Sequence, residues 1–210
     1  MEQVTFKYND TDCKLYVAND WVSESIKESQ TFYEKSLLDH IYKKFGEGKI
    51  FVDVGANIGN HTYFFAKICK AERVYAFDPD SIYFELLYHN TKDFFGTVLL
   101  VNCALGIGTE EEGKILGKKA IIDKLDNYVD YCDVIKIDVE GMESDVIVGA
   151  ERLIHTCHPT LYLEAKDDQA KKRIDFYMPA KKRWEGKWYQ VTEVFRSGTP
   201  IYEYTWKGEK

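Results

Sequence analysis

The chain of 210 residues has few of the features that mark membrane, secreted or modular proteins. No apolar run approaches the roughly 18 residues that a bilayer span requires. The polar opening, MEQVTFKYNDTD, has no apolar stretch of signal-peptide length. Only four prolines occur, and neither an internal repeat nor a proline-rich linker divides the chain. These absences predict one soluble, cytoplasmic domain with no membrane partner.

Paired cysteines and excess positive charge are also absent. The five cysteines are scattered without a C-x-x-C pair, so we expect reduced thiols and no disulfide frame. The stretch His155-Thr156-Cys157-His158 has metal-capable side chains, but no second ligand pair accompanies it, and we expect no metal. The net charge of -7 argues against broad binding to a nucleic-acid backbone. A local basic patch would be the exception.

The pattern of the chain predicts an α/β fold. The opening VTFKYNDTDCKLYVA alternates around Asn9-Asp10 as a β-hairpin does, and SQTFYEKSLLDHIYKKFG has helical spacing that stops at Gly46. Five apolar strands follow: KIFVDVG, RVYAFDP, TVLLVNCALG, DVIKIDVEG and PTLYLEAK. Amphipathic helices separate most of them: HTYFFAKICK, SIYFELLYHNTKDFF and SDVIVGAERLI. Residues 106–119 are interpreted as a loop, and WYQVTEVF with PIYEYTW as an antiparallel hairpin at the edge. Nearly continuous apolar strands separated by helices indicate a doubly wound, mostly parallel sheet with helices on both faces.

Each of the five strands ends in a polar residue, and a parallel sheet gathers these ends at one edge. That carboxyl edge is where open α/β sheets bind ligands. Any strand that runs into a loop can end in a polar residue, but five in register favour ligand binding. The five residues are Asp53, Asp78, Asn102, Asp138 and Glu164.

The sequence VDVGANIGN, followed by a helix, is the sharpest local signal. Gly55 would permit a tight turn, and Gly59 would allow the helix to pack close to the strand. The first turn of that helix would then offer free N–H groups to a polar ligand. We therefore expect a ligand-binding loop here.

Asp78 ends the next strand, where a carboxylate can accept both hydroxyls of a ribose. The alternative is that Asp78 caps the following helix, although Asp80 or Ser81 could do so equally well. The loop lacks the G-x-G-x-x-G pattern of dinucleotide sites. Asp53 beside it would repel a pyrophosphate but would pair with a methionine ammonium group. These residues favour S-adenosyl-L-methionine over NAD.

In their order along the chain, VDVGANIGN, VYAFDPD, VNCALG, LDNYV, DVIKIDVEGME and PTLYLEAK resemble the FkbM family of methyltransferases. The resemblance implies the class I methyltransferase fold, which is Rossmann-like with seven strands. It also implies O-methylation of a hydroxyl on a sugar or another small molecule. We expect one domain, with a hairpin extension at 1–29, a cofactor-binding core at 30–165 and a basic segment with the final hairpin at 166–210.

The resemblance also assigns residues. Glu34, in Phe32-Tyr33-Glu34, matches a short aromatic–Glu stretch before the first strand. Lys136, Asp138, Glu140 and Gly141 match the family's signature. The cofactor residues that it implies are Glu34, Asp53, Gly55, Ala56, Asn57, Gly59, Asp78, Asn102, Cys103, Ala104 and Asp138.

A hydroxyl acceptor loses its proton as it is methylated, so we expect a general base. Asp138 and Glu140 are the first candidates, because crowding with Glu164 would raise one carboxyl pKa towards neutrality. His61, at the start of the helix after the loop, is the next candidate. The alternative is that Asp138 and Glu140 cap a helix that starts near Met142.

Seven basic residues lie between Lys171 and Lys187, interleaved with Phe176, Tyr177, Trp184 and Trp188. They indicate either an anionic acceptor or a solvated helix face with its aromatic residues packed inward. The leading prediction is a small-molecule O-methyltransferase. An RNA- or protein-modifying methyltransferase and a catalytically silent cofactor-binding module remain open alternatives.

Overall fold

A computed structural model describes residues 1–108, 111–115, 118–178, 189–197 and 199–208. The chain begins with the predicted hairpin of β1 (Glu2–Tyr8) and β2 (Thr11–Val17). Its turn residues Asn9 and Asp10 both have positive φ, as a tight hairpin turn requires. Two helices follow, α1 (Trp21–Ser29) and α2 (Lys35–Phe45).

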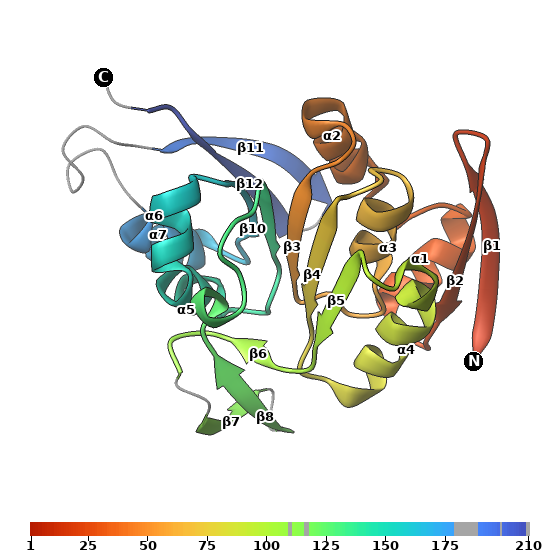
Figure 1. Ribbon diagram of the computed structural model, residues 1–210, viewed down its shortest axis with the longest axis horizontal. Helices are drawn as coiled ribbons and strands as arrows, with labels where there is room; N and C mark the ends of the chain where they lie inside the picture. Colours follow the sequence, from red (N-terminus) through yellow and green to blue (C-terminus); the bar gives the residue numbers. More distant parts are fainter. Residues whose placement is uncertain (109–110, 116–117, 179–188, 198, 209–210) are drawn as a thin grey trace.

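The predicted seven-stranded sheet forms the centre of the fold, in the order β11-β12-β10-β9-β3-β4-β5 (Figure 1). Its strands are β3 (Ile50–Val54), β4 (Arg73–Phe77), β5 (Val98–Val101), β9 (Val134–Ile137), β10 (Thr160–Glu164), β11 (Tyr189–Ser197) and β12 (Thr199–Trp206). The strands from β10 to β5 are parallel, and β12 pairs antiparallel with β10. The mostly parallel sheet and its C-terminal edge hairpin are therefore confirmed.

Helices cover both faces of the sheet, as predicted for a doubly wound fold (Figure 1). Phe51 of β3 packs into a core with the N-terminal hairpin and α1, α2 and α3 (Asn60–Lys67). Its neighbour Val52 points to the opposite core, with α5 (Glu143–Gly149), α6 (Glu151–Cys157) and α7 (Asp168–Tyr177). This alternation along an apolar strand is what burial on both faces produces. The helix α4 (Ser81–Thr91) follows β4, and short 3-10 turns lie at Lys92–Phe94 and Leu125–Asn127.

The prediction of a loop at 106–119 was wrong. A small sheet forms there, in which β8 (Lys118–Asp123) pairs antiparallel with β7 (Glu111–Ile115) and parallel with β6 (Ala104–Leu105). The segment TVLLVNCALG is likewise two strands, β5 and β6, in different sheets. Charged and glycine-rich strands in a small ribbon lack the apolar signal of a core strand, so the sequence concealed them.

Helix boundaries also differ from the predictions. The predicted helix over SQTFYEKSLLDHIYKKFG starts only at Lys35, because Glu34 has a left-handed backbone with φ 53, and it ends at the C-cap Gly46 as expected. The segment SDVIVGAERLI forms two helices that break at Ala150.

No described helix combines the length and apolar composition needed to cross a bilayer.

Candidate active site

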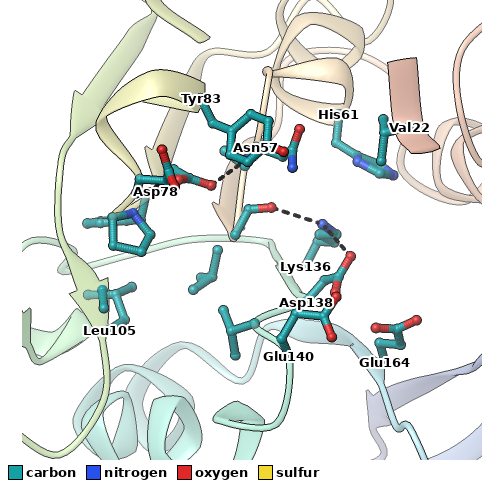
Figure 2. A pocket seen from close by; sticks show the side chains of 18 of the residues that line it. Val22, Asn57, His61, Asp78, Tyr83, Leu105, Lys136, Asp138, Glu140 and Glu164 are labelled. Carbon is teal, nitrogen blue, oxygen red and sulfur yellow. Dashed lines mark hydrogen bonds and ion pairs between the residues drawn. The ribbon is translucent and has the colours of Figure 1, made fainter. Parts of the chain in front are cut away.

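A cavity of about 290 Å³ opens at the carboxyl edge of the sheet (Figure 2). Figure 2 shows Asp78, Tyr83 and Leu105 at one end and His61, Val22 and Glu164 at the other, with Lys136 and Asp138 between them. Nine of the predicted site residues line it: Gly55, Ala56, Asn57, His61, Asp78, Cys103, Ala104, Asp138 and Glu140. The other predicted residues, Glu34, Asp53, Gly59 and Asn102, are not part of its lining.

The loop between β3 and α3 forms one wall of the cavity. Gly55 has φ +79, and a Cβ there would lie 1.8 Å from the Asp138 carbonyl oxygen, so only glycine fits. The N–H groups of Gly55 and Ala56 both donate to the Phe77 carbonyl oxygen at 3.0 Å, which ties the loop to β4. A Cβ at Gly59, which has φ +87, would lie 2.7 Å from Leu87 of α4. The expected close packing of Gly59 is thus against α4 and not against the strand.

Asp78 anchors the loop at the first end of the cavity. Its Oδ2 accepts from the Asn57 N–H at 2.7 Å, and its Oδ1 accepts from the Asp80 N–H at 2.9 Å. Asp80 caps α4 by accepting from the Ile82 N–H, so Asp78 is not the helix cap that was its alternative role. Asn102 donates to the Asp78 carbonyl oxygen at 2.8 Å and so acts on the backbone behind the cavity. Burial raises the pKa of the Asp78 carboxyl to about 6.

Lys136 is a buried cation in the middle of the site, with 5% of its side chain exposed. Its Nζ lies 3.4 Å from Asp138 Oδ2, 3.8 Å from Asp53 Oδ1 and 3.4 Å from the Gly55 carbonyl oxygen. Burial alone would lower the Lys136 pKa, but Asp138, Asp53 and Glu34 hold it above its ordinary value. Asp53 is fully buried and also accepts from the Thr62 hydroxyl at 2.6 Å. Asp53 therefore reaches the cavity only through Lys136.

Asp138 and Glu164 form a hydrogen-bonded pair of carboxyl groups beside this cation. Burial and the charge of Asp138 raise the pKa of Glu164 to about 8, so Glu164 carries the shared proton at neutral pH. Burial works against ionisation of Asp138 as well. The charge of Lys136, a hydrogen bond from Glu164 and the charge of His61 together outweigh burial and lower the pKa of Asp138. The predicted crowding of carboxylates is present, and the residue whose pKa it raises is Glu164.

Glu34 and His61 meet at the second end of the cavity. Glu34 Oε2 lies 3.0 Å from His61 Nε2, and only 8% and 6% of the two side chains are exposed. His61 lines the cavity, whereas Glu34 lies behind it. The structure thus brings together two residues that the sequence placed in different roles.

Glu140 lines the cavity with a left-handed backbone of φ 55. Glu143 accepts from the Gly141 N–H at 2.9 Å and from the Val139 N–H at 3.4 Å, and Met142 holds the N-cap position of α5. The alternative that Asp138 and Glu140 cap this helix is therefore not what the structure has. Glu143, for which the sequence predicted no role, instead accepts the hydrogen bonds from the N–H groups of this loop.

Several lining residues were missed by the sequence analysis. Trp21 and Val22 come from α1, which no motif indicated, and Tyr83 comes from α4, just beyond the motif VYAFDPD. Leu105 and Met142 lie within the motifs VNCALG and DVIKIDVEGME, but no role was assigned to them. A lone lysine in the apolar strand VIKI was a readable signal for the buried cation, whereas nothing in the sequence around Trp21 connects it with the cavity.

The remaining candidate features lie elsewhere. Among the described residues, no three His, Cys, Asp or Glu side chains gather as metal ligands would. In the basic segment, Lys171 pairs with Asp175 at 2.6 Å and lies over the Tyr202 ring. Phe176 and Tyr177 are 60% and 46% exposed, so these two aromatic residues do not pack inward. Six further residues of that segment lie outside the described residues: Lys181, Lys182, Arg183, Trp184, Lys187 and Trp188.

The strand order, the antiparallel β12 and the cavity at the carboxyl edge define the class I methyltransferase fold. Precorrin-6y C5,15-methyltransferase from Geobacter metallireducens GS-15 shares this fold (18% identity, TM-score 0.54, 83% of this chain and 87% of that one). M. jannaschii TYW2, solved in complex with AdoMet, shares it over 98% of this chain and 86% of that one (18% identity, TM-score 0.55).

A narrower relationship follows from the sequence. The profile of the methyltransferase FkbM domain matches residues 120–182, which confirms the resemblance that the motifs indicated. The methyltransferase FkbM from Methylobacillus flagellatus KT superposes with a TM-score of 0.61 at 23% identity, over 76% of this chain. This chain spans 44% of the length of that protein. No curated protein matches the chain in sequence.

Proposed function

We propose that the chain is a methyltransferase that binds S-adenosylmethionine in the cavity at the carboxyl edge of its sheet. The observation that carries the proposal is the charge of the lining. Among the described residues, five carboxyl groups line the cavity, of which Glu164 carries a proton at neutral pH, whereas the lining cations are Lys136 and, when protonated, His61. The carboxyl groups belong to Asp78, Asp80, Asp138, Glu140 and Glu164. A negative lining suits a sulfonium and an ammonium group and opposes a pyrophosphate.

The two ends of the cavity suit the two halves of that cofactor. Asp78 would accept the ribose hydroxyls, and the ring of Tyr83 and the apolar side chain of Leu105 would flank the adenine together with the Cys103–Ala104 backbone. The Lys136–Asp138 pair would hold the charged methionine part, with Asp53 acting on it through Lys136. When bound, the cofactor supplies an activated methyl group, and the chain's task is to orient the acceptor and remove its proton.

The proposed acceptor is a hydroxyl group on a sugar or another small, uncharged molecule. The negative lining of the cavity favours such an acceptor over a phosphate-rich one. RNA or protein as the acceptor is the second candidate. The fold is also that of the rRNA methylase from Streptococcus thermophilus and of the ribosomal protein L11 methylase from Lactobacillus delbrueckii subsp. bulgaricus. The basic segment is the feature of this chain that would favour RNA.

Thermal unfolding with two candidate ligands tests the cofactor. A ligand that binds only the folded state stabilises it by about 2.7 kcal/mol at one hundred times its Kd. For a chain of this length that energy raises Tm by roughly 5–10 °C. S-adenosylhomocysteine should produce such a shift and NAD should not. Equal shifts with both ligands, or none with either, would rule out the proposed cofactor.

Methyl transfer from labelled S-adenosylmethionine then tests the acceptor. Neutral methyl glycosides, sugar phosphates and a short RNA are offered in parallel at low and high salt. Labelling of the glycosides supports the proposal. Labelling of the RNA alone, with a steep dependence on salt, would favour the second candidate.

A further inference from the structure

Glu34 and His61 form an acid–base pair for which the fold itself has no evident need. Both Glu34 Oε2 and His61 Nε2 are buried, and neither has a hydrogen-bond partner among the described residues. Buried polar atoms without a hydrogen bond are costly, because each has lost its hydration, and here only the ion-pair contact at 3.0 Å offsets that cost. Such a pair at the wall of a ligand cavity is a candidate for a chemical role.

A backbone clamp holds the pair in register. The side chain of Asn60 accepts from the Tyr33 N–H at 3.0 Å and donates to the Tyr33 carbonyl oxygen at 3.1 Å. Asn60 directly precedes His61 on α3, and Tyr33 directly precedes Glu34. The two hydrogen bonds therefore fix the segment that carries the carboxylate against the helix that carries the imidazole. Glu34 also has a left-handed backbone, a costly conformation for a residue other than glycine, and such strain gathers at functional sites.

The neighbouring carboxyl groups are poorly suited to accept a proton at neutral pH. Asp138 lies against Lys136, and its lowered pKa makes it a weak base. Glu164 already carries a proton, because burial and Asp138 raise its pKa. Lys136 is a cation and has no free electron pair. Tyr33 also lines the cavity beside His61, but burial raises the pKa of its phenol to about 12, so it keeps its proton. Glu140 lines the cavity as well and, unlike His61, has no contact with Glu34 among the described residues.

We propose that His61 takes the proton from the acceptor hydroxyl and that Glu34 is a positioning residue, not a cofactor ligand. The inference rests on the proposed methyltransferase function. The acceptor oxygen forms the new O–CH₃ bond, the S–CH₃ bond breaks, and its electron pair stays on sulfur. The hydroxyl proton passes to Nδ1 of His61, because Nε2 faces Glu34. The carboxylate of Glu34 then stabilises the imidazolium until the proton leaves to water. A carboxylate behind a catalytic histidine acts in this way in hydrolytic triads.

The ring tautomer of His61 tests this arrangement in the free protein, without cofactor or acceptor. ¹⁵N NMR of the neutral ring should show the proton on Nε2 and an unprotonated Nδ1, with the signal identified by its loss in His61→Gln. A proton on Nδ1 would overturn the proposal, because that nitrogen could not then accept one.

Kinetics separate positioning from cofactor binding. With the methyl glycoside that the wild type methylates fastest, Glu34→Gln and His61→Gln should each lower kcat at least a hundredfold. The Kd of S-adenosylhomocysteine, measured by calorimetry, should change less than twofold in both variants. Glu34→Asp keeps the charge and should recover at least tenfold of the lost kcat. Glu28→Gln, on the exposed face of α1, is the matched control and should behave as the wild type.

Two results would overturn the proposal while leaving the methyltransferase function intact. One is a tenfold or greater rise of the S-adenosylhomocysteine Kd in Glu34→Gln with kcat retained, since Glu34 would then bind the cofactor. The other is normal turnover in His61→Gln with a hundredfold loss in Asp138→Asn, which would make Asp138 the base. Failure of the wild type to bind S-adenosylhomocysteine at all would instead refute the proposed function.

Discussion

Replacing Asp78 with asparagine measures how much the buried carboxylate destabilises the free protein and how much it contributes to cofactor binding. Asp78 is 6% exposed, and burial raises its pKa from the ordinary 3.8 to about 6. A gap of about two pKa units corresponds to about 3 kcal/mol, by which ionisation of this carboxyl weakens the folded state at neutral pH. Asparagine has nearly the same shape and carries no charge, so it removes that cost.

The gain is smaller than the full 3 kcal/mol, because Asp78 also accepts hydrogen bonds from the N–H groups of Asn57 and Asp80. The single amide oxygen of asparagine can keep one of them, and losing the other costs about 1 kcal/mol. We expect Asp78→Asn to stabilise the free protein by about 1–2 kcal/mol at pH 7.5, which raises Tm by roughly 3–6 °C. A folded-state pKa above the unfolded value means that the wild type loses stability as pH rises from 4 through 6. The gain in stability should therefore disappear near pH 4, where the variant keeps only the cost of the lost hydrogen bond.

The same substitution should weaken the cofactor site. Losing a charge-assisted pair costs about 1.5–3 kcal/mol, so the Kd of S-adenosylhomocysteine should rise roughly 10- to 150-fold. In the wild type, Kd should also rise as pH falls below 6, whereas the variant should lack this dependence. Scanning calorimetry from pH 4 to pH 7.5, with calorimetric titration at each pH, measures both effects. A variant that is less stable and binds with unchanged affinity would show that Asp78 only anchors the loop.

Three further substitutions test the frame around the site. Gly55→Ala should lower the free energy of unfolding by more than about 2 kcal/mol and abolish cofactor binding, because its Cβ would overlap the Asp138 carbonyl oxygen. The control is Gly48→Ala, at a glycine with φ +71 and no atom within 4 Å of the added Cβ. In chemical unfolding it should show only the smaller cost of the backbone conformation. Lys136→Met leaves the buried Asp53 carboxylate and the partly exposed Asp138 carboxylate without their cation and should lower the free energy of unfolding by about 3 kcal/mol in urea titrations. Burial raises the Glu203 pKa, but hydrogen bonds from four side chains outweigh it and lower that pKa from 4.5 to about 2. Glu203→Gln should therefore lower the free energy of unfolding by about 1–2 kcal/mol at neutral pH, a figure reduced because the partners of Glu203 are partly exposed. The loss should fade as pH falls from 4.5 to 2. A loss of stability that does not depend on pH would refute the role of the Glu203 charge.

Local chemistry explains why the loop and the strand ends were predictable. The positive φ at Gly55 and Gly59 follows from contacts within one strand–loop–helix unit, and the sequence VDVGANIGN carries that information directly. Asp78 ends the neighbouring strand, so its approach to Asn57 follows from parallel pairing of consecutive strands. Such features depend on short stretches of chain whose order in the sheet is nearly fixed.

Contacts between distant segments were not predictable in this way. Asp53 was expected to face a ligand, but in the pairing of β3 with β9 its partner is Lys136, which neutralises it behind the cavity wall. Glu34 was assigned to the cofactor by resemblance alone. Its contact with His61 depends on a left-handed turn before α2, and no residue pattern around Glu34 signals that turn. The placement of Trp21 at the cavity likewise depends on how α1 packs.

Three unfavourable features gather at the carboxyl edge. Burial disfavours ionisation of the Asp78 carboxyl, Asp53 Oδ1 lacks a hydrogen-bond partner among the described residues, and Glu34 has a strained backbone. A chain selected for stability alone would replace each of them with an apolar or flexible residue, since each costs free energy in the free protein. They share one property, which is negative charge beside the same cavity. Lys136 offsets only part of that charge, and a cationic ligand would offset more. The arrangement is therefore better explained by the ligand than by the fold, and the cost that each residue imposes on the free protein is the quantity that substitution can measure.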